Sequence, residues 1–284
     1  MLDYPALAAL AEIIRRGSFE AAAAALHVTP SAISQRIKGL EERMGAVLIH
    51  RGPPARGTEQ GLRLMQHLDR VRLLEQGLTD ESQPAMLRIA VNADSLATWF
   101  PPAMTALNVT YDLEIDDQDH ARDWLRQGKV SAAITSDPDP VPGCDVIALG
   151  RMRYLALATP DFIARHFAGG VTAETLVAAP VVIFNAKDAA QAQWAQSITG
   201  QRLHLTGHLI PSSEAFARAV ELGLGWGMIP ETMAAPALSE NRLSPLAPTP
   251  LDVPLHWQVQ RALKPALAPL TAAIRKKAAE TLRP

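Results

Sequence analysis

Residues 17–41 read G-S-F-E-A-A-A-A-A-L-H-V-T-P-S-A-I-S-Q-R-I-K-G-L-E and predict two short helices joined by a tight turn. Ser18 and Thr29 are candidate N-caps, because a hydroxyl there accepts a hydrogen bond from the free amides of a helix's first turn. Pro30 suits the first helical position, where no backbone N–H is required. Apolar residues recur three or four apart in both segments, so each helix has one face that can be buried.

Hydroxyl, amide and cationic side chains cover the outer face of the second helix. Groups of these types read the edges of DNA bases and hold phosphates. The same pattern also suits an amphipathic helix pair whose polar face simply contacts water. The candidate DNA-binding residues of this helix and its cap are Thr29, Pro30, Ser31, Ser34, Gln35, Arg36 and Lys38.

A short hairpin is predicted directly after these helices. Residues 45–61 read G-A-V-L-I-H-R-G-P-P-A-R-G-T-E-Q-G, a short apolar strand and a Pro-Pro turn with Arg51 and Arg56 on either side. Two arginines on such a hairpin form a wing that can follow phosphates or enter a minor groove. Residues 1–57 are therefore predicted to be a winged helix-turn-helix domain that binds double-stranded DNA.

The length of 284 residues suits two or three domains, and the charge is unevenly distributed among them. Residues 1–57 hold seven Lys or Arg against five Asp or Glu, whereas the remaining chain holds twenty against twenty-four. A mildly basic head on an acidic body fits a nucleic-acid module joined to a second module.

Cysteine content and hydropathy exclude several classes of protein. With Cys144 as the single cysteine, the chain can form no internal disulfide and no cysteine-based metal site. We expect no metal and no cofactor, because the sequence also lacks histidine metal motifs and a dinucleotide-binding glycine loop. The N-terminal residues do not read as a secretory signal, and no uncharged apolar stretch is long enough to span a membrane. We therefore expect a cytoplasmic protein with no membrane partner.

A new helix is predicted to begin near Thr58, with apolar residues three or four positions apart. These residues are Leu62, Met65, Leu68, Val71, Leu74 and Leu78. We expect this seam to pack against a second copy of the chain, so residues 58–84 are predicted to be a linker and dimerisation helix in a homodimer or homotetramer. The alternative is that the seam packs back on its own domain. Gln83 and Pro84 end the helix.

Beyond residue 85, strands and helices alternate, which favours a mostly parallel sheet with helices on its faces. We expect two α/β lobes joined by two crossing segments: lobe I from residues 86–158 and 251–284, and lobe II from residues 159–250. Small ligands bind in the cleft of such a pair, at the carboxyl ends of strands. The predicted fold class is α+β overall, with a mainly helical winged head, a long linker helix and a two-lobed α/β domain at residues 85–284.

Several motifs resemble one known family. The run A-A-x-x-L-H-V-T-P-S-A-I-S-Q-R-I-K-x-L-E, followed by G-x-x-L-I-x-R and T-E-Q-G, resembles the winged helix-turn-helix of LysR-type transcriptional regulators. The segments V-N-A-D-S-L-A-T-W, F-N-x-K-D and P-S-S-E-A-F-A-R-A-V-E-L-G-L-G-W-G-M-I-P resemble the arginine/lysine-responsive branch of that family. Ile49 and His50 stand where the family more often has Phe and a polar residue, which we expect to alter local packing only.

The resemblance implies a function and a set of partners. It implies a periplasmic-binding-protein-like effector domain, a dimerisation arm formed by the linker helix, and contact with RNA polymerase. It further implies L-lysine or L-arginine as effector, and control of genes for export or metabolism of basic amino acids.

A basic amino acid offers one carboxylate and two cationic groups. The carboxylate suits hydroxyls at helix N-termini, for which Ser95, Ser212 and Ser213 are candidates. The cationic groups suit carboxylates after strands, and an amide can bond either end of the ligand. The candidates for these roles are Asp116, Asp117, Asp188 and Asn185. Each of these residues also suits a purely structural cap, and Asp94, equally suited to a cap and to a ligand contact, is left out of the predicted site.

Catalytic motifs are missing from the sequence, so we expect no enzyme. The histidines form no HExxH or HxH pattern. The glycine-rich residues 223–227 follow a predicted helix and precede a strand, whereas a dinucleotide-binding loop follows a strand and opens a helix. The alternative function is a non-regulatory ligand-binding protein of periplasmic-binding-protein-like fold, whose N-terminal domain has another role.

Overall fold

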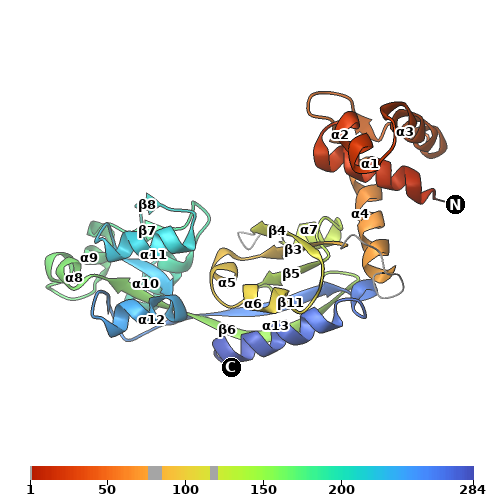
Figure 1. Cartoon of the computed structure of the whole chain (residues 1–284). Coiled ribbons are helices and arrows are strands. Elements are labelled where there is room, and N and C mark those ends of the chain that lie inside the picture. The colour runs from red at the N-terminus through yellow and green to blue at the C-terminus, as the bar shows by residue number, and fades with distance from the viewer. Residues whose placement is uncertain (1, 76–84, 116–120) are drawn as a thin grey trace.

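The computed structural model describes residues 2–75, 85–115 and 121–284. A small helical head lies at one end, helix α4 descends from it, and a two-lobed C-terminal domain extends to the other side (Figure 1). This arrangement confirms the predicted fold class. In the described part of the chain, no helix has the length and apolar character that crossing a bilayer requires.

The head consists of three helices and a two-stranded wing, and the two predicted caps, Ser18 and Thr29, begin its second and third helices. Ser18 Oγ accepts from the amide of Ala21 at 3.2 Å, and Thr29 Oγ1 accepts from the amide of Ala32 at 3.2 Å. Gly17 ends the first helix in the left-handed conformation at φ 68°. The elements are α1 (Tyr4–Arg16), α2 (Phe19–Ala25), α3 (Pro30–Met44), β1 (Ile49–His50) and β2 (Arg56–Gly57).

Helix α4 (Glu59–Glu75) differs from the prediction, because part of its apolar seam packs within its own chain. Met65 and Leu68 are buried in the core of their own head, whereas Leu74 is 46% exposed. A spacing of three residues falls short of one helical turn by about 60°, so successive members of the seam drift around the helix. The seam therefore divides, and its first part packs within the chain; Leu78 lies outside the described residues.

One sheet runs through both lobes of the C-terminal domain. Its strands are β3 (Met86–Val91), β4 (Thr110–Ile115), β5 (Ala132–Thr135), β6 (Cys144–Ala158), β9 (Gly227–Pro230), β10 (Ser244–Pro245) and β11 (Leu251–Gln260). The order is β10-β6-β11-β5-β3-β4, and β9 also pairs with β6. Only β3, β4 and β5 pair in parallel among these, so the expectation of a mostly parallel sheet is wrong.

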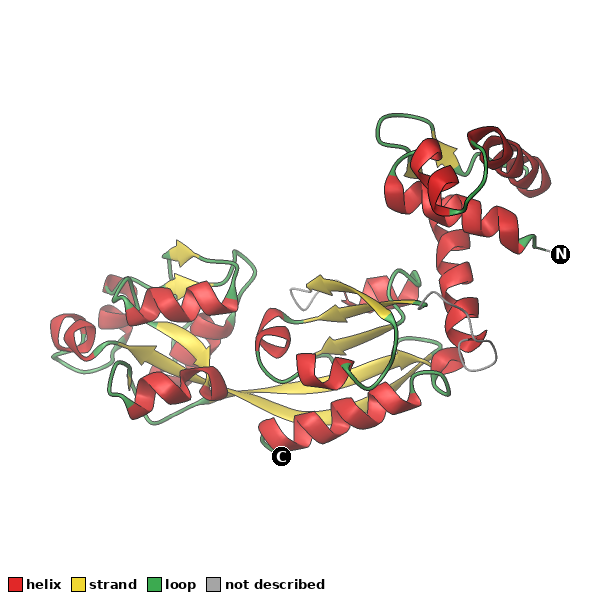
Figure 2. Ribbon diagram, viewed as in Figure 1, coloured by secondary structure: helices red, strands yellow, loops and turns green. Residues whose placement is uncertain are grey.

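The long strands β6 and β11 explain this difference, because they pair antiparallel with each other and pass from one lobe to the other (Figure 2). The proximal lobe, next to α4, carries β3–β5. Its helices are α5 (Ala93–Ala97), α6 (Pro101–Met104), α7 (Ala121–Arg126), the short η1 (Arg261–Leu263) and α13 (Ala268–Thr281).

The distal lobe carries β9 and a small parallel pair, β7 (Val182–Ile183) with β8 (His208–Leu209). Its helices are α8 (Pro160–His166), α9 (Ala173–Ala178), α10 (Ala190–Thr199), α11 (Ser213–Glu221) and α12 (Glu231–Ser239). The chain therefore crosses between the lobes on β6 and returns on β11.

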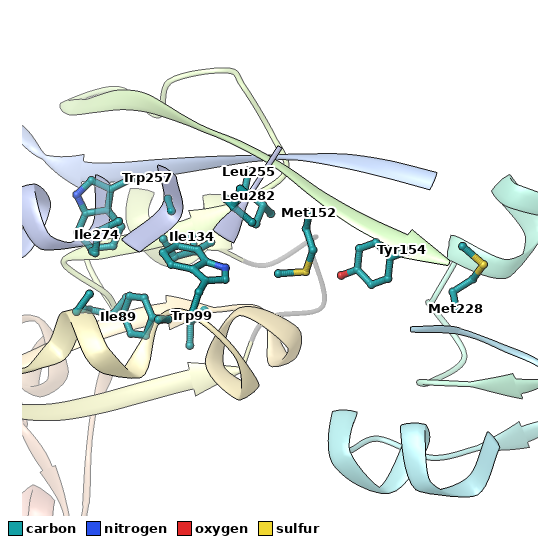
Figure 3. Packing of buried hydrophobic residues seen from close by; sticks show 14 of the residues in the cluster. Ile89, Trp99, Ile134, Met152, Tyr154, Met228, Leu255, Trp257, Ile274 and Leu282 are labelled. Carbon is teal, nitrogen blue, oxygen red and sulfur yellow. The ribbon is translucent and has the colours of Figure 1, made fainter. Parts of the chain in front are cut away.

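A continuous apolar cluster links the two lobes along β6. Trp99 and Met152 belong to its proximal part and Met228 to its distal part, with Tyr154 lying between Met152 and Met228 (Figure 3). Trp257 is fully buried and donates from Nε1 to Thr271 Oγ1 at 3.1 Å, which ties β11 to α13. The hydroxyl group of Tyr154 thus lies where the two lobes meet.

Candidate functional site

A cleft of about 300 Å³ lies between the lobes, at the waist crossed by β6 and β11. Aromatic and aliphatic side chains form part of its wall, including Phe184 and Phe216 of the distal lobe. The polar residues that line it are Asn92, Asp94, Ser136, Tyr154, Asn185, Lys187, Asp188, Gln193, Ser213 and Asp252. A mixed wall of this kind, with a few polar groups that converge, is typical of small-molecule sites.

Asp94 lines this cleft and connects three elements there. It lies on α5 of the proximal lobe, and its Oδ2 accepts from Tyr154 Oη of β6 at 2.7 Å. Its Oδ1 accepts from Ser213 Oγ, at the start of α11 in the distal lobe, at 2.6 Å. One carboxylate therefore joins both walls of the cleft through two neutral donors.

Burial sets the ionisation of this group. Burial raises the pKa of Asp94 above its ordinary value, and the nearby carboxylate of Asp188 raises it further, whereas the hydrogen bonds from Ser213 and Tyr154 oppose the shift. Burial also raises the pKa of Tyr154, with the charge of Asp94 next in effect, so its phenol remains a proton donor. A cationic ligand placed here would relieve the repulsion between the two carboxylates.

Asp188 rigidifies the loop that forms the distal wall. Its Oδ2 accepts from the amide of Phe184 and its Oδ1 from the amide of Ala190, both at 3.0 Å. In the same loop, Asn185 Oδ1 accepts from the amide of Lys187 at 2.8 Å. The carboxylate of Asp188 is thus held in place by neutral backbone donors while it lines the cleft.

Asp252 on β11 is the third carboxylate of the lining, and it is already paired. Arg153 of β6 donates to both of its oxygens at 2.8 Å, from Nε and from Nη2. The Arg153 guanidinium holds the pKa of Asp252 below its usual range. Because this charge is neutralised within the protein, Asp94 and Asp188 are the carboxylates suited to a ligand's cationic groups.

The head presents its polar residues along α3 and the wing. Gln35 and Lys38 are exposed on α3, whereas Ser34 and Arg36 are half-buried. The remaining α3 candidates, Thr29, Pro30 and Ser31, are exposed at its N-terminal end. Figure 1 shows α3 at the outer side of the head, away from the C-terminal domain. This face is open to a large partner.

The wing places two more cationic groups beside α3. Arg51 and Arg56 are both exposed, one on each side of the wing's turn. The guanidinium of Arg51 lies 3.7 Å from Glu41 of α3 and 5.5 Å from the centroid of the Phe19 ring. Contacts to α3 and α2 therefore hold the wing at a fixed place next to the helix.

Comparison with known proteins assigns both parts of the chain. Residues 5–62 match the family described as bacterial regulatory helix-turn-helix protein, lysR family, and residues 80–279 match the LysR substrate binding domain. The chain belongs to the LysR family. It is 42% identical over 289 residues to the HTH-type transcriptional regulator LysG of Mycobacterium tuberculosis, covering 99% of this chain and 95% of that one.

Solved structures of other LysR-family proteins agree with this fold along the whole chain. The crystal structure of ArgP from Mycobacterium tuberculosis is 41% identical, with a TM-score of 0.82, and the match covers 100% of this chain and 99% of that one. Full-length LysG from Corynebacterium glutamicum with bound effector Arg is 38% identical, with a TM-score of 0.67, and the match covers 100% of both chains.

Within this LysR-family chain, the structure brings three of the predicted effector residues to one cleft: Asn185, Asp188 and Ser213. Ser212 lies outside the lining, and its hydroxyl caps α11, accepting from the amide of Ala215 at 3.4 Å. The hydroxyl of Ser95 is fully buried, away from the cleft lining, and has no hydrogen-bond partner among the described residues. Asp116 and Asp117 lie outside the described residues.

The other seven polar residues of the lining are absent from the predicted site, and Asp94 and Tyr154 are the two of them that bond each other in the cleft. Asp94 precedes Ser95 at the same strand-to-helix junction, and its side chain makes tertiary hydrogen bonds in place of the cap that was considered for it. Tyr154 carries no local signal, because it stands within β6 between Arg153 and the apolar residues 155–158. Its place in the cleft becomes evident only from the hydrogen bond between its hydroxyl and Asp94.

Proposed function

We propose that this protein is a transcriptional regulator whose head binds promoter DNA and whose cleft binds L-arginine or L-lysine. The observation that carries the proposal is the pair of carboxylates, Asp94 and Asp188, facing one cleft from both lobes. The relatives named LysG and ArgP, about 40% identical along the whole chain, support the same function. Control of genes for basic amino-acid export or metabolism, in the cytoplasm, follows as part of the proposal.

The chemistry of the cleft suits such a ligand. We infer that Asp94 and Asp188 bind the two cationic groups, because both receive their protein hydrogen bonds from neutral donors. Lys187 lines the cleft and carries the positive charge that suits the α-carboxylate, whereas the hydroxyl proton of Ser213 is already donated to Asp94. The aromatic walls can cover the methylene chain between the charged ends. Asn185 can bond either end.

Binding in this cleft would be coupled to the head through the lobes. A ligand that contacts both lobes favours one angle between them, and by linkage it binds the favoured arrangement more tightly than the other. We propose that two or four copies hold recognition helices on separate half-sites and that the effector alters DNA bending and contact with RNA polymerase. The DNA contacts are assigned to α3 and the wing.

Calorimetry on the full chain tests the effector assignment. Arginine or lysine should give saturable binding, whereas citrulline, which has nearly the shape of arginine without its distal charge, should bind much more weakly. If neither basic amino acid gives heat or a thermal shift, the effector assignment is wrong. A binding signal for citrulline equal to that for arginine would also overturn the role of the carboxylates.

Gel shifts separate the regulator from the alternative of a non-regulatory ligand-binding protein. The double variant Gln35→Ala with Arg36→Ala should lose the specific shift on the protein's own promoter region while the chain remains folded. Arg43→Ala is the matched control, since Arg43 lies on α3 but pairs with Asp3 at 3.2 Å. Unchanged specific binding by the double variant would refute the assignment of α3 as the recognition helix.

A further inference from the structure

The residues after α13 return to the waist of the C-terminal domain. Arg151 of β6 donates its amide to the carbonyl of Arg283 at 2.7 Å, and Arg283 donates its amide to the carbonyl of Arg151 at 2.9 Å. Leu282 is only 9% exposed and belongs to the apolar cluster shared by the lobes. Residues 282–284 therefore add a short antiparallel bridge to β6 at the point where it leaves the proximal lobe.

The backbone of β6 is shaped for this approach at Gly150. Its φ is +123°, and a Cβ atom built there would lie 2.6 Å from the carbonyl oxygen of Arg283. Opposite it, the register between β6 and β11 shifts between Leu255 and His256, as in a β-bulge. A glycine and an irregular pairing thus occur together where residues 282–284 pack.

The side chain of Arg283 extends from this bridge to the distal lobe. Its Nε and Nη2 donate to Glu231 Oε2 at 3.2 and 2.6 Å. Glu231 is the first residue of α12, and it follows Pro230, which lines the cleft. Arg283 is anchored through its neighbour Leu282 in the core and through its backbone on β6, so its ion pair ties α12 to the waist.

We propose that Arg283 and Glu231 form a positioning pair that holds the two lobes at the angle in which the cleft is complete. The proposal rests on the proposed function, because it assigns a role to the pair in effector affinity. In this structure Asp94 of the proximal lobe bonds Ser213 of the distal lobe, so the angle that the pair holds is the one in which both walls meet. The pair therefore favours effector binding without touching the effector.

The expected effect is modest because the pair is partly in water. The side chain of Arg283 is 50% exposed and that of Glu231 34%. Ion pairs of this exposure contribute little, so Arg283→Ala should weaken the affinity for arginine about twofold to fivefold. Arg275→Ala is the matched control, since Arg275 is exposed on α13 and removes the same charge from the same region.

Calorimetry with arginine on the full-length variants tests the pair. Glu231→Gln should weaken binding by a similar factor, and its combination with Arg283→Ala should be no worse than either single change, because both remove one interaction. Arg283→Lys should restore part of the affinity. Equal affinities of Arg283→Ala and Arg275→Ala, or effects of Arg283→Ala and Glu231→Gln that multiply, would overturn the proposal.

A distance measurement separates this proposal from the proposed function. Spin labels at Ala272→Cys on α13 and Gln196→Cys on α10, both exposed, report the separation of the lobes in a Cys144→Ala background. Arg283→Ala should broaden the distance distribution of the ligand-free protein, and Arg275→Ala should not. An unchanged distribution would refute the positioning pair even if arginine binds, whereas a broadened one would support it even if the effector assignment fails.

Discussion

Replacing Asp94 by Asn removes one negative charge from the cleft and leaves the shape of the side chain almost unchanged. Asp94 Oδ1 and Oδ2 accept from Ser213 and Tyr154 at 2.6 and 2.7 Å. An amide retains one acceptor oxygen for these two hydroxyls but presents an NH₂ group where the second hydroxyl donates. The substitution therefore weakens the link between the lobes and abolishes the attraction for a cation.

The magnitude follows from the contact that would be lost. A hydrogen bond to a charged group contributes about 1.5–3 kcal/mol, so the affinity for arginine should fall about tenfold to 100-fold. Stability should change much less than affinity. Burial raises the pKa of Asp94, which means that keeping this carboxylate ionised opposes folding, and the neutral amide avoids that penalty.

Calorimetry with arginine and citrulline measures the effect on the full chain. The Asn variant should lose affinity for arginine and discriminate less between the two ligands. Asp145→Asn is the matched control, because Asp145 pairs with Lys264 and Arg261 on the surface of the proximal lobe. If the Asp94 variant binds arginine as tightly as the wild type, or if the control loses as much, the assignment of Asp94 to the ligand's cation is refuted.

Three further predictions concern pH, the head and the wing. The raised pKa of Asp94 means that its contribution to the free energy of unfolding is full below the ordinary aspartate range and is lost as the pH rises through the pKa of the folded protein. Arginine needs the ionised carboxylate, so calorimetry should show its affinity falling as the pH drops through that pKa. The Asp94→Asn variant should lack this pH dependence of affinity. Arg15→Ala leaves Asp69, whose pKa is raised by burial, without the hydrogen-bonded partner that opposes this shift most, and should lower the free energy of unfolding in urea by about 2–4 kcal/mol. Arg43→Ala removes an exposed pair and should lower it by about 0–1 kcal/mol, so equal losses would contradict the argument. Arg56→Ala should weaken specific and unrelated DNA alike and reduce the salt slope by about 1 in fluorescence anisotropy, whereas a change in sequence preference would contradict a phosphate contact.

Features encoded by neighbouring residues were predictable from the sequence. The caps formed by Ser18 and Thr29 act on amides three positions further along the chain, so the residue types alone reveal them. The left-handed glycine at position 17 is equally local. The two helices within residues 17–41 could therefore be described from the sequence.

The cleft depends on contacts that no local pattern encodes. Asp94 bonds Tyr154 and Ser213, which lie 60 and 119 positions away along the chain. The sequence favours Ser95, its neighbour, because a hydroxyl at the start of a helix suggests an anion site. Adjacent residues point about 100° apart on a helix, so only one of the two could face the cleft, and periodicity does not say which.

Sheet direction was unpredictable for a related reason. Alternating strands and helices favour parallel pairing, and β3, β4 and β5 follow that expectation. The two crossing strands belong to both lobes at once, and β6 alone is 15 residues long. The apolar residues 155–158 identify the last part of β6 as a strand. The full length of β6 and its antiparallel partner β11 depend on tertiary pairing, which no local pattern shows.

Helix α4 packs against both the head, which carries the proposed DNA-binding face, and the C-terminal domain, which carries the cleft. Met65 and Leu68 are buried in the core of the head, whereas Leu73, little more than one turn further along, is buried in the core of the C-terminal domain. Arg70, between these two groups, donates to the carbonyl of Gly128 at 3.3 Å, directly after α7. Because α4 has side chains in both hydrophobic cores, a rotation of the proximal lobe is transmitted to the head. This coupling requires that the contact between Arg70 and Gly128 stays intact. An effector that changes the angle between the lobes therefore acts on the recognition helix only to the extent that it also moves the proximal lobe relative to α4.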